Sequence, residues 1–508
     1  MINRLDISTN SPAFFWSVIV TIICASTALR FGGTTPDVSW LIDMCERILN
    51  GEKAYIDIFE TTPPIPMLLY MPGALFSQLT GMSAEFCVYA LAYGSAVAAF
   101  AVTLRILPDY PVRDIPTRWA IIFPAAFFLF VLSTDAFAQR EFFAAAFMLP
   151  MVAVFVSNAE NDRWPPVTSR LWAALFCGLS VAIKPPLFAL PAFFLAGFYL
   201  FRTRQFRFIY SSGLIAAAIF SAALTLVSLL AFPDYLSGVL TLMRDVYTPY
   251  RVHYLISLQP AFIVTLLCLS LIGVLMFNAK LPASTGFFAV TALGYIAAYF
   301  AQGKFFAYHL LPAVMFVFIA LWTIFVRQII PVVIAAQKIT PKIMASLALV
   351  MIPVALLYDV FDDKRPSMED MSWAKSIEKR PTAMAITPSI ALSFPLAREV
   401  DAIWVDRIHS QWVSHYAKLA SDQKGYSETQ FQLFRQYQDS DLERTKNVIQ
   451  QKRPELIFQC VLERHMWISD RLLDLDPALL DGYQVIAEDD VFRIWQLKPK
   501  LAATSQAF

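Results

Sequence analysis

Long apolar runs recur along this chain from Phe14 to Tyr358, and they restrict its possible folds more than any other feature. A helix needs about 20 apolar residues to cross about 30 Å of hydrocarbon, and many of the runs reach that length. The chain is 57% hydrophobic and 16% charged, with a mean hydropathy of +0.55. It is therefore predicted to be a polytopic α-helical membrane protein.

The runs predict about 11 transmembrane helices, the first being a retained span and not a cleaved signal peptide. We expect them near 13–31, 84–107, 119–134, 141–157, 171–184, 186–201, 208–232, 258–277, 284–301, 305–326 and 342–360. The apolar stretch 65–80 is too short to span and is interrupted by Pro72 and Gly73. We expect it to form an interfacial helix that lies on the membrane.

The basic residues between the spans indicate the orientation. With the N-terminus in the cytoplasm, the basic clusters, such as Arg202, Arg204 and Arg207, all fall in loops on that side. An odd number of spans then places the C-terminal region outside. The absence of an N-x-S/T sequence and the small number of cysteines favour the inner membrane of a bacterium, with the C-terminal region in the periplasm.

The character of the chain changes near Asp362, where charge rises and the apolar runs shorten. We therefore divide the chain into a transmembrane catalytic domain, 1–361, with an outer loop at 32–83, and a soluble α/β domain, 362–508. Strands are expected in TAMAITPS, AIWVDRI, PELIFQCV and QVIAEDDVFRIWQL, with a polar helix at 421–453 between them. The tryptophans Trp404, Trp412, Trp467 and Trp495 are suited to stack on sugar rings, but we expect most of them to pack in the core of this region.

Ionisable residues gather in the predicted outer loops, where charges beside apolar helices usually serve a function. The first loop is acidic, and the later loops add cations and two histidines. The first-loop carboxylates are Asp37, Asp43, Glu46, Glu52, Asp57 and Glu60. The later candidates are Arg140 with its neighbour Glu141, then Lys184, Arg244, Arg251, His253, Lys304 and His309.

This combination suits a lipid-linked anionic substrate. Cations would bind its phosphate, since charge-assisted hydrogen bonds to phosphate are strong. A carboxylate would take a proton from an incoming hydroxyl as general base. The net charge of +1 offers no basic field for nucleic acid.

The order of several motifs resembles the polyprenyl-phosphate-dependent glycosyltransferases of the GT-C fold. This group includes lipid A aminoarabinose transferase and protein O-mannosyltransferases. The resemblance covers roughly the first 330 residues and rests on Asp37 just after the first span, followed by WLIDMCERILNGEKAY, FETTPPIPMLLY, AQREFFAAAFMLP, AIKPPLFALP and FAYHLLPAVMF. It implies transfer of a sugar, with inversion, from a polyprenyl-phosphate donor to a hydroxyl of a glycan, lipid or protein.

By position, the resemblance makes Asp37 the catalytic base and Glu60 a second catalytic residue that holds the acceptor or positions the base. The aminoarabinose type has a lysine after that glutamate, whereas this chain has Thr61 and Thr62. Phosphate binding is then expected from the later cations listed above, with Asp57, Glu141 and His253 as further substrate-binding candidates. Some relatives use a divalent cation, so Mg²⁺ or Mn²⁺ is an open alternative, but no ligand spacing typical of a metal site is present.

Several of these residues also suit purely structural roles. Asp37 suits a helix N-cap, Glu141 suits a helix N-terminus, and Lys184 suits a side chain that reaches for the membrane surface. Asp43, Glu46 and Glu52 are expected on the solvated face of a loop helix. Competing functions are a lipid-linked sugar flippase or other transporter, and a polymerase or ligase that acts on polyprenyl-diphosphate oligosaccharides.

Overall fold

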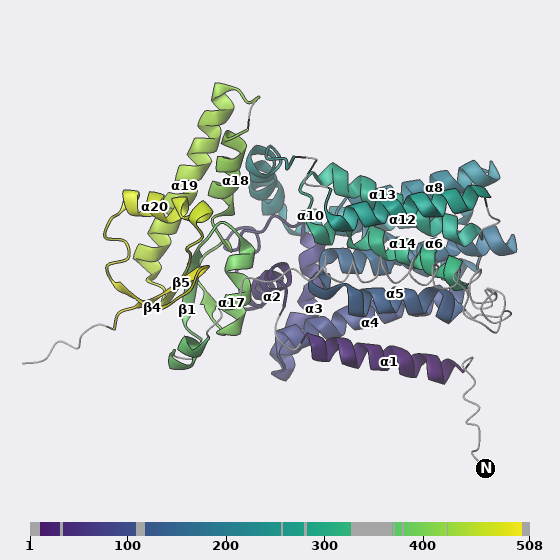
Figure 1. The fold of residues 1–508 in the computed structure, drawn as a ribbon, viewed down its shortest axis with the longest axis horizontal. Helices are drawn as coiled ribbons and strands as arrows, with labels where there is room; N and C mark the ends of the chain where they lie inside the picture. The colour runs from purple at the N-terminus through teal and green to yellow at the C-terminus, as the bar shows by residue number, and fades with distance from the viewer. Residues whose placement is uncertain are drawn as a thin grey trace, which may run out of the picture. The chain divides into compact units, whose positions relative to one another are not determined.

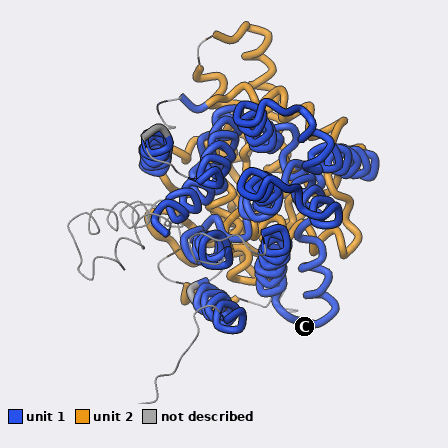
Figure 2. Tube along the Cα trace, turned by 90° about the vertical axis from the view of Figure 1, so that its right-hand side faces the viewer, with its two compact units in different colours: residues 1–32, 63–231, 252–363 blue, residues 33–62, 232–251, 364–508 orange. Residues whose placement is uncertain are grey.

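The computed structural model describes residues 11–30, 34–107, 117–253, 255, 258–278, 282–326, 368, 371–377, 380–423 and 425–499. The chain forms two compact units that do not follow chain order (Figure 2). Unit 1 comprises Met1–Gly32, Pro63–Ala231 and Val252–Asp363, and unit 2 comprises Gly33–Thr62, Phe232–Arg251 and Lys364–Phe508. Residues 33–62, which contain the acidic part of the first loop, therefore belong to the same unit as the C-terminal region.

Unit 1 is helical in its described residues. Its α-helices are α1 (Pro12–Leu29), α3 (Pro64–Thr80), α4 (Ala84–Ile106), α5 (Phe123–Phe127), α6 (Arg140–Asn161), α7 (Val167–Ile183), α8 (Leu190–Thr203), α9 (Phe208–Ser211), α10 (Leu214–Ala231), α12 (Pro260–Asn278), α13 (Ala283–Gln302) and α14 (Leu311–Ile324). Stretches of π-helix, Arg118–Ile122 and Phe128–Leu132, flank α5. Short 3-10 turns, Leu187–Ala189 and Ala307–Leu310, lead into α8 and α14.

Within the described residues, five helical segments are long and apolar enough to cross a membrane: Ala84–Ile106, Arg140–Asn161, Leu214–Ala231, Ala283–Gln302 and Ala307–Ile324. Shorter apolar helices cover Pro12–Ala28, Arg118–Leu132, Val167–Ile183, Leu187–Thr203 and Pro260–Met276. Each segment coincides with an expected span. The expected span 342–360 lies outside the described residues, and the total of 11 stays a prediction. The stretch 65–80 is confirmed as a helix, α3, whose place at the membrane surface also stays a prediction.

Helix α6 is the central helix of unit 1, since it packs against α4, α7, α13 and α14 (Figure 1). All of its residues from Glu141 to Asn158 are buried. In contrast, α10 leaves Ile219, Leu226 and Leu230 exposed, which suits a helix that faces lipid. Charged side chains at the start of α6 are therefore shielded from solvent by the neighbouring helices.

Unit 2 is built on a five-stranded mixed sheet in the order β2-β1-β3-β5-β4. Its strands are β1 (Thr382–Ile386), β2 (Ile403–Trp404), β3 (Leu456–Cys460), β4 (Tyr483–Glu488) and β5 (Phe492–Leu497). Strand β1 is parallel to β2 and β3, and β5 is antiparallel to β3 and β4. Its α-helices are α2 (Pro36–Leu49), α11 (Leu240–Leu242), α17 (Phe394–Glu399), α18 (Trp412–Ser421), α19 (Glu428–Lys452) and α20 (Trp467–Leu475).

Strands β1 and β3 and helices α19 and α20 share one apolar core, which contains Met384, Leu442, Ile457 and Leu472. The expected strands and polar helix are present. However, QVIAEDDVFRIWQL is a hairpin and not one strand. The turn forms because Asp489 Oδ1 accepts hydrogen bonds from the Val491 and Phe492 amides at 2.8 and 2.7 Å.

A second core joins the segment 232–251 to helices α18 and α19. It contains Val246, Ala417 and Phe434, with Tyr250 and Tyr416 packed against it. The expectation of core packing is confirmed for Trp404 and Trp412, which are both 4% exposed. Trp467 and Trp495 are partly buried and pack against the first core.

Candidate active site

Arg140 and Glu141 begin helix α6. The turn before them is fixed by Ala138, whose φ of 58° is left-handed and whose carbonyl oxygen accepts a hydrogen bond from Tyr70 Oη at 2.6 Å. Glu141 lies in the first turn of the helix and is fully buried. The helix N-terminus stabilises its negative charge, so the sequence places a carboxylate inside unit 1.

Lys184 follows the last residue of α7 and turns toward this carboxylate. Its Nζ pairs with Glu141 Oε1 and donates to Gln302 Oε1 at 3.0 Å. Its side chain is only 13% exposed. Contacts with α6 and α13 therefore hold Lys184 inside unit 1, and its place relative to the membrane surface stays a prediction.

His309 completes this cluster from the turn before α14. Its Nε2 lies 3.7 Å from Glu141 Oε1, and the side chain is buried. Arg140 and Lys184 are near enough for their charges to act on it. Lys304 is also buried, one residue after Gly303, whose left-handed φ of 64° ends α13. We call Arg140, Glu141, Lys184, Gln302 and His309 the buried charge cluster.

Two polar atoms of the cluster have further capacity to bond. Glu141 Oε2 and His309 Nδ1 are buried and make no hydrogen bond within the described part of the chain. Buried polar atoms are almost always hydrogen-bonded. These atoms therefore suit contact with a bound polar ligand or water.

The other predicted residues fall mainly in unit 2. Asp37 is half-buried in the first turn of α2. The N-cap is Thr35, so the alternative in which Asp37 is the N-cap is wrong. Burial holds the pKa of Tyr416 well above its usual range, with further contributions from Tyr247, Tyr250 and the charge of Asp37. Tyr416 therefore stays protonated near Asp37 and is able to donate a hydrogen bond.

Glu60 is buried and held by three donors. Its Oε2 accepts from Trp40 Nε1 at 2.5 Å, and its Oε1 accepts from the Thr62 amide at 2.6 Å and from Thr61 Oγ1 at 3.2 Å. With both oxygens engaged, this carboxylate suits positioning better than proton transfer. Asp57 is exposed and accepts from the Lys53 amide at 2.8 Å, which closes a turn.

The expectation that Asp43, Glu46 and Glu52 form a solvated helix face is wrong for Asp43, because α2 packs against α17. Asp43 is buried, with Oδ2 3.7 Å from Arg47 Nη1, and burial raises the pKa of Asp43 to about 7. Glu46 is half-buried and pairs with Arg398 of α17. Glu52 is also half-buried and pairs with Arg47 at 2.6 Å.

The remaining cations are more exposed. Arg244 is 73% exposed, and its Nε donates to Asp245 Oδ1 at 2.7 Å. Arg251 and His253 are also exposed. His253 belongs to unit 1, and its Nδ1 accepts from the Leu255 amide at 3.3 Å. These side chains are less well prepared to hold a phosphate than the buried charge cluster.

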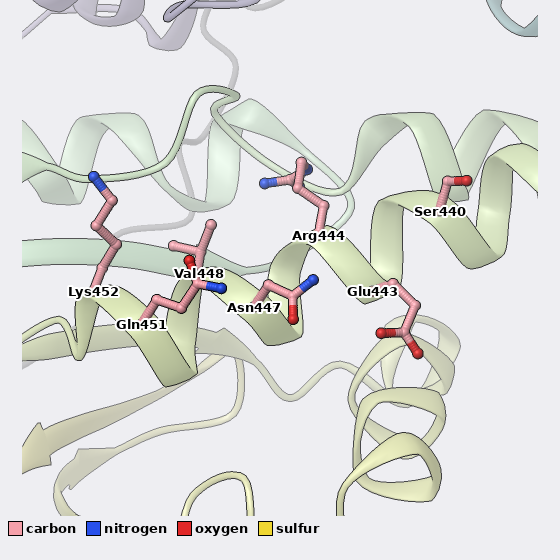
Figure 3. Close-up of a pocket in the computed structure, with 7 residues that line it drawn as sticks. All are labelled: Ser440, Glu443, Arg444, Asn447, Val448, Gln451 and Lys452. Atoms are coloured by element: carbon pink, nitrogen blue, oxygen red, sulfur yellow. The ribbon is translucent and has the colours of Figure 1, made fainter.

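A groove of about 520 Å³ lies along one face of α19 (Figure 3). It is lined by Ser440, Glu443, Arg444, Asn447, Val448, Gln451 and Lys452. None of the predicted site residues lines it, and Arg444 is engaged by Asp406 and Asp441. We therefore keep it apart from the candidate site.

Three residues that lie beside the predicted site residues were not predicted from the sequence. Gln302 and Tyr416 carry no local signal, because only tertiary contacts bring them to the other residues. Trp40 could have been noticed, since it follows Asp37 by three residues and so lies near the same face of the helix. Within the described residues, no group of three or more His, Cys, Asp or Glu side chains is placed to hold a metal ion.

Comparisons by sequence find no matching protein-family model and no matching curated protein. The structure is nevertheless similar to the crystal structure of ArnT from Cupriavidus metallidurans bound to undecaprenyl phosphate, with a TM-score of 0.55 at 13% identity. This match covers 95% of the chain and 97% of ArnT. The chain has an ArnT-like membrane fold.

The apo form of ArnT gives a TM-score of 0.53 over the same shares of the two chains. The ArnT-like fold confirms the resemblance inferred from the first 330 residues. Because the match covers nearly the whole chain, it extends to the C-terminal region, where the sequence motifs were absent.

Proposed function

We propose that this protein is a membrane glycosyltransferase that transfers a sugar from a polyprenyl-phosphate donor to a hydroxyl acceptor. The buried charge cluster is the observation that carries this proposal. Lys184 and His309 lie against the fully buried Glu141 carboxylate, and the charge of Arg140 acts on His309. Such preorganised cations would stabilise a phosphate as it leaves the sugar. The ArnT-like fold supports the same substrate class, since ArnT itself was solved with undecaprenyl phosphate.

The proposed reaction is a single displacement that inverts the anomeric carbon. Asp37 takes the proton of the acceptor hydroxyl, and the acceptor oxygen forms a new bond to the anomeric carbon. The bond between that carbon and the phosphate oxygen breaks, and its electron pair stays with the leaving polyprenyl phosphate. The transition state resembles an oxocarbenium ion, as in other glycosyl chemistry.

We assign phosphate binding to Arg140, Lys184 and His309. Glu141 holds Lys184 and His309 in place when no donor is bound. The buried Lys304 is a further cation for the donor, whereas the exposed Arg244, Arg251 and His253 suit the entry of an anionic substrate. Glu60 and Asp57 fix the conformation of the first loop.

We further propose an inner-membrane protein with a cytoplasmic N-terminus and a periplasmic C-terminal region. A glycan, a lipid or a protein would supply the acceptor hydroxyl.

The test is a turnover assay with purified full-length protein and undecaprenyl-phosphate sugars, hexoses and pentoses, beside matched diphosphate donors. We expect free undecaprenyl phosphate to be released from the monophosphate donors when an acceptor extract is added. Transport of the intact donor across a vesicle membrane without cleavage would identify a flippase instead. Turnover of diphosphate donors alone would identify a polymerase or ligase.

A further inference from the structure

Trp40 lies on helix α2, next to Phe394 and His409 of the C-terminal region. Its indole is 1% exposed, and its Nε1 donates to Glu60 Oε2 at 2.5 Å. A charge-assisted hydrogen bond of this kind is stronger than a neutral one. Trp40 therefore fixes one oxygen of a carboxylate that the first-loop motif singles out.

The C-terminal region holds this indole on two sides. The Trp40 ring meets Phe394 edge to face at 4.8 Å and His409 at 5.4 Å. Both partners are themselves held, since Phe394 packs on Trp404 at 4.8 Å and His409 Nδ1 bonds Ser410 Oγ at 2.8 Å. Burial lowers the pKa of His409 to about 4, so the imidazole is neutral at the pH of the cell.

Further contacts bind the same loop to residues 398–407. Arg47 Nη1 donates to the Asp406 carbonyl oxygen at 2.9 Å, and the Phe59 amide donates to the Arg407 carbonyl oxygen at 2.6 Å. Glu46 pairs with Arg398. Helix α2 and the residue before Glu60 are thus both attached to this region.

Asp37 and Trp40 lie three residues apart on α2, so they are neighbours on the helix surface. We infer that Trp40 is a positioning residue, through which the C-terminal region fixes Glu60 directly and Asp37 by way of α2. This inference rests on the proposed function. It gives Phe394 and His409, which contact the Trp40 ring, a part in positioning the predicted site.

Trp404 provides a matched control. It is an equally buried indole in the same aromatic cluster, but its Nε1 donates to the Ile408 carbonyl oxygen at 3.0 Å and not to Glu60. Trp40→Phe and Trp404→Phe each remove one indole hydrogen bond and keep an aromatic ring. Only Trp40→Phe removes a contact with the predicted site.

The first measurement is hydrogen exchange of the Thr61 and Thr62 amides in the full-length protein in detergent. We expect Trp40→Phe to speed their exchange about 10-fold, because the Thr62 amide bonds the same carboxylate, and Trp404→Phe to change it by less than about twofold. Equal exchange in the two variants would overturn the positioning role. This measurement does not depend on the reaction catalysed.

The second measurement is turnover of the undecaprenyl-phosphate sugar that the wild type uses. We expect Trp40→Phe to lower kcat about 10-fold with both KM values within about twofold, and Trp404→Phe to leave kcat unchanged. In a Glu60→Gln background the effect of Trp40→Phe should disappear. A similar loss of kcat in both tryptophan variants would show that Trp40 contributes only through core packing. If the wild type cleaves no such donor, the proposed function fails, and the exchange result still decides the role of Trp40.

Discussion

Replacing Lys184 with methionine separates the stability of the buried charge cluster from its capacity to bind phosphate. Methionine keeps most of the alkyl stem but removes the charge, and so leaves the fully buried Glu141 carboxylate without its closest cation. Breaking a buried ion pair from one side costs about 3–5 kcal/mol. We therefore expect a loss of about 3 kcal/mol in the free energy of unfolding.

The double variant Lys184→Met/Glu141→Gln removes both charges. Its stability should return to within about 1 kcal/mol of the wild type, since replacing a whole buried pair is often neutral. Its affinity for undecaprenyl phosphate should stay low. One charge-assisted bond is worth about 1.5–3 kcal/mol, which corresponds to about 10–100-fold in Kd.

The assay compares thermal unfolding in detergent with binding of undecaprenyl phosphate to the same samples. Lys418→Met is the control, because Lys418 and its partner Asp422 form an exposed pair, 39% and 60% exposed at 3.0 Å. Wild-type affinity in Lys184→Met would refute the phosphate role. A double variant as unstable as the single one would refute the pairing of Lys184 with Glu141 as the cause of the loss.

Other predictions concern unit 2 and the substrate. Asp43→Asn should flatten the pH dependence of the free energy of unfolding. Burial raises the pKa of Asp43 in the folded protein to about 7. The protonated Asp43 carboxyl therefore contributes its full stabilisation below about pH 4, and this stabilisation is lost as pH rises through about 7. Denaturation at several pH values checks this, and an unchanged profile would count against it. Arg444→Ala should destabilise the protein by about 3–5 kcal/mol, because it leaves the buried carboxylates of Asp406 and Asp441 without their cationic partner. Arg471→Ala should cost under about 1 kcal/mol, because Arg471 and Asp439 form an exposed pair. Equal midpoints of unfolding would contradict this difference. Lys184→Ala should weaken binding of the donor more than binding of the acceptor, and equal losses of the two affinities would speak against a phosphate contact.

Much of the fold follows from local pattern. Apolar runs predict the apolar helices of unit 1, such as α4, α6 and α13, because a span must be apolar along its whole length. Strands such as β1 and β3 are predicted by short apolar segments between breakers. The hairpin β4–β5 was predicted as one strand because Asp489 and Asp490 look like polar positions of an alternating pattern, and their role in a turn depends on backbone bonds.

The contacts between the site residues are harder to predict from the sequence. Glu141 and Lys184 were candidates separately, but their pairing joins residues 43 positions apart, which no local pattern encodes. Asp43 was misplaced because an amphipathic helix shows which face is polar and not what covers it. Here residues more than 350 positions away, among them Arg398, cover that face.

The most direct test of the central claim is the product formed by Asp37→Asn. With a donor of known anomeric configuration, the wild type should give a product of inverted configuration and release undecaprenyl phosphate. Asp37→Asn should bind the donor with wild-type affinity and give no product, because asparagine cannot accept the proton of the acceptor hydroxyl. Turnover by Asp37→Asn at the wild-type rate, or a product with retained configuration, would contradict the account.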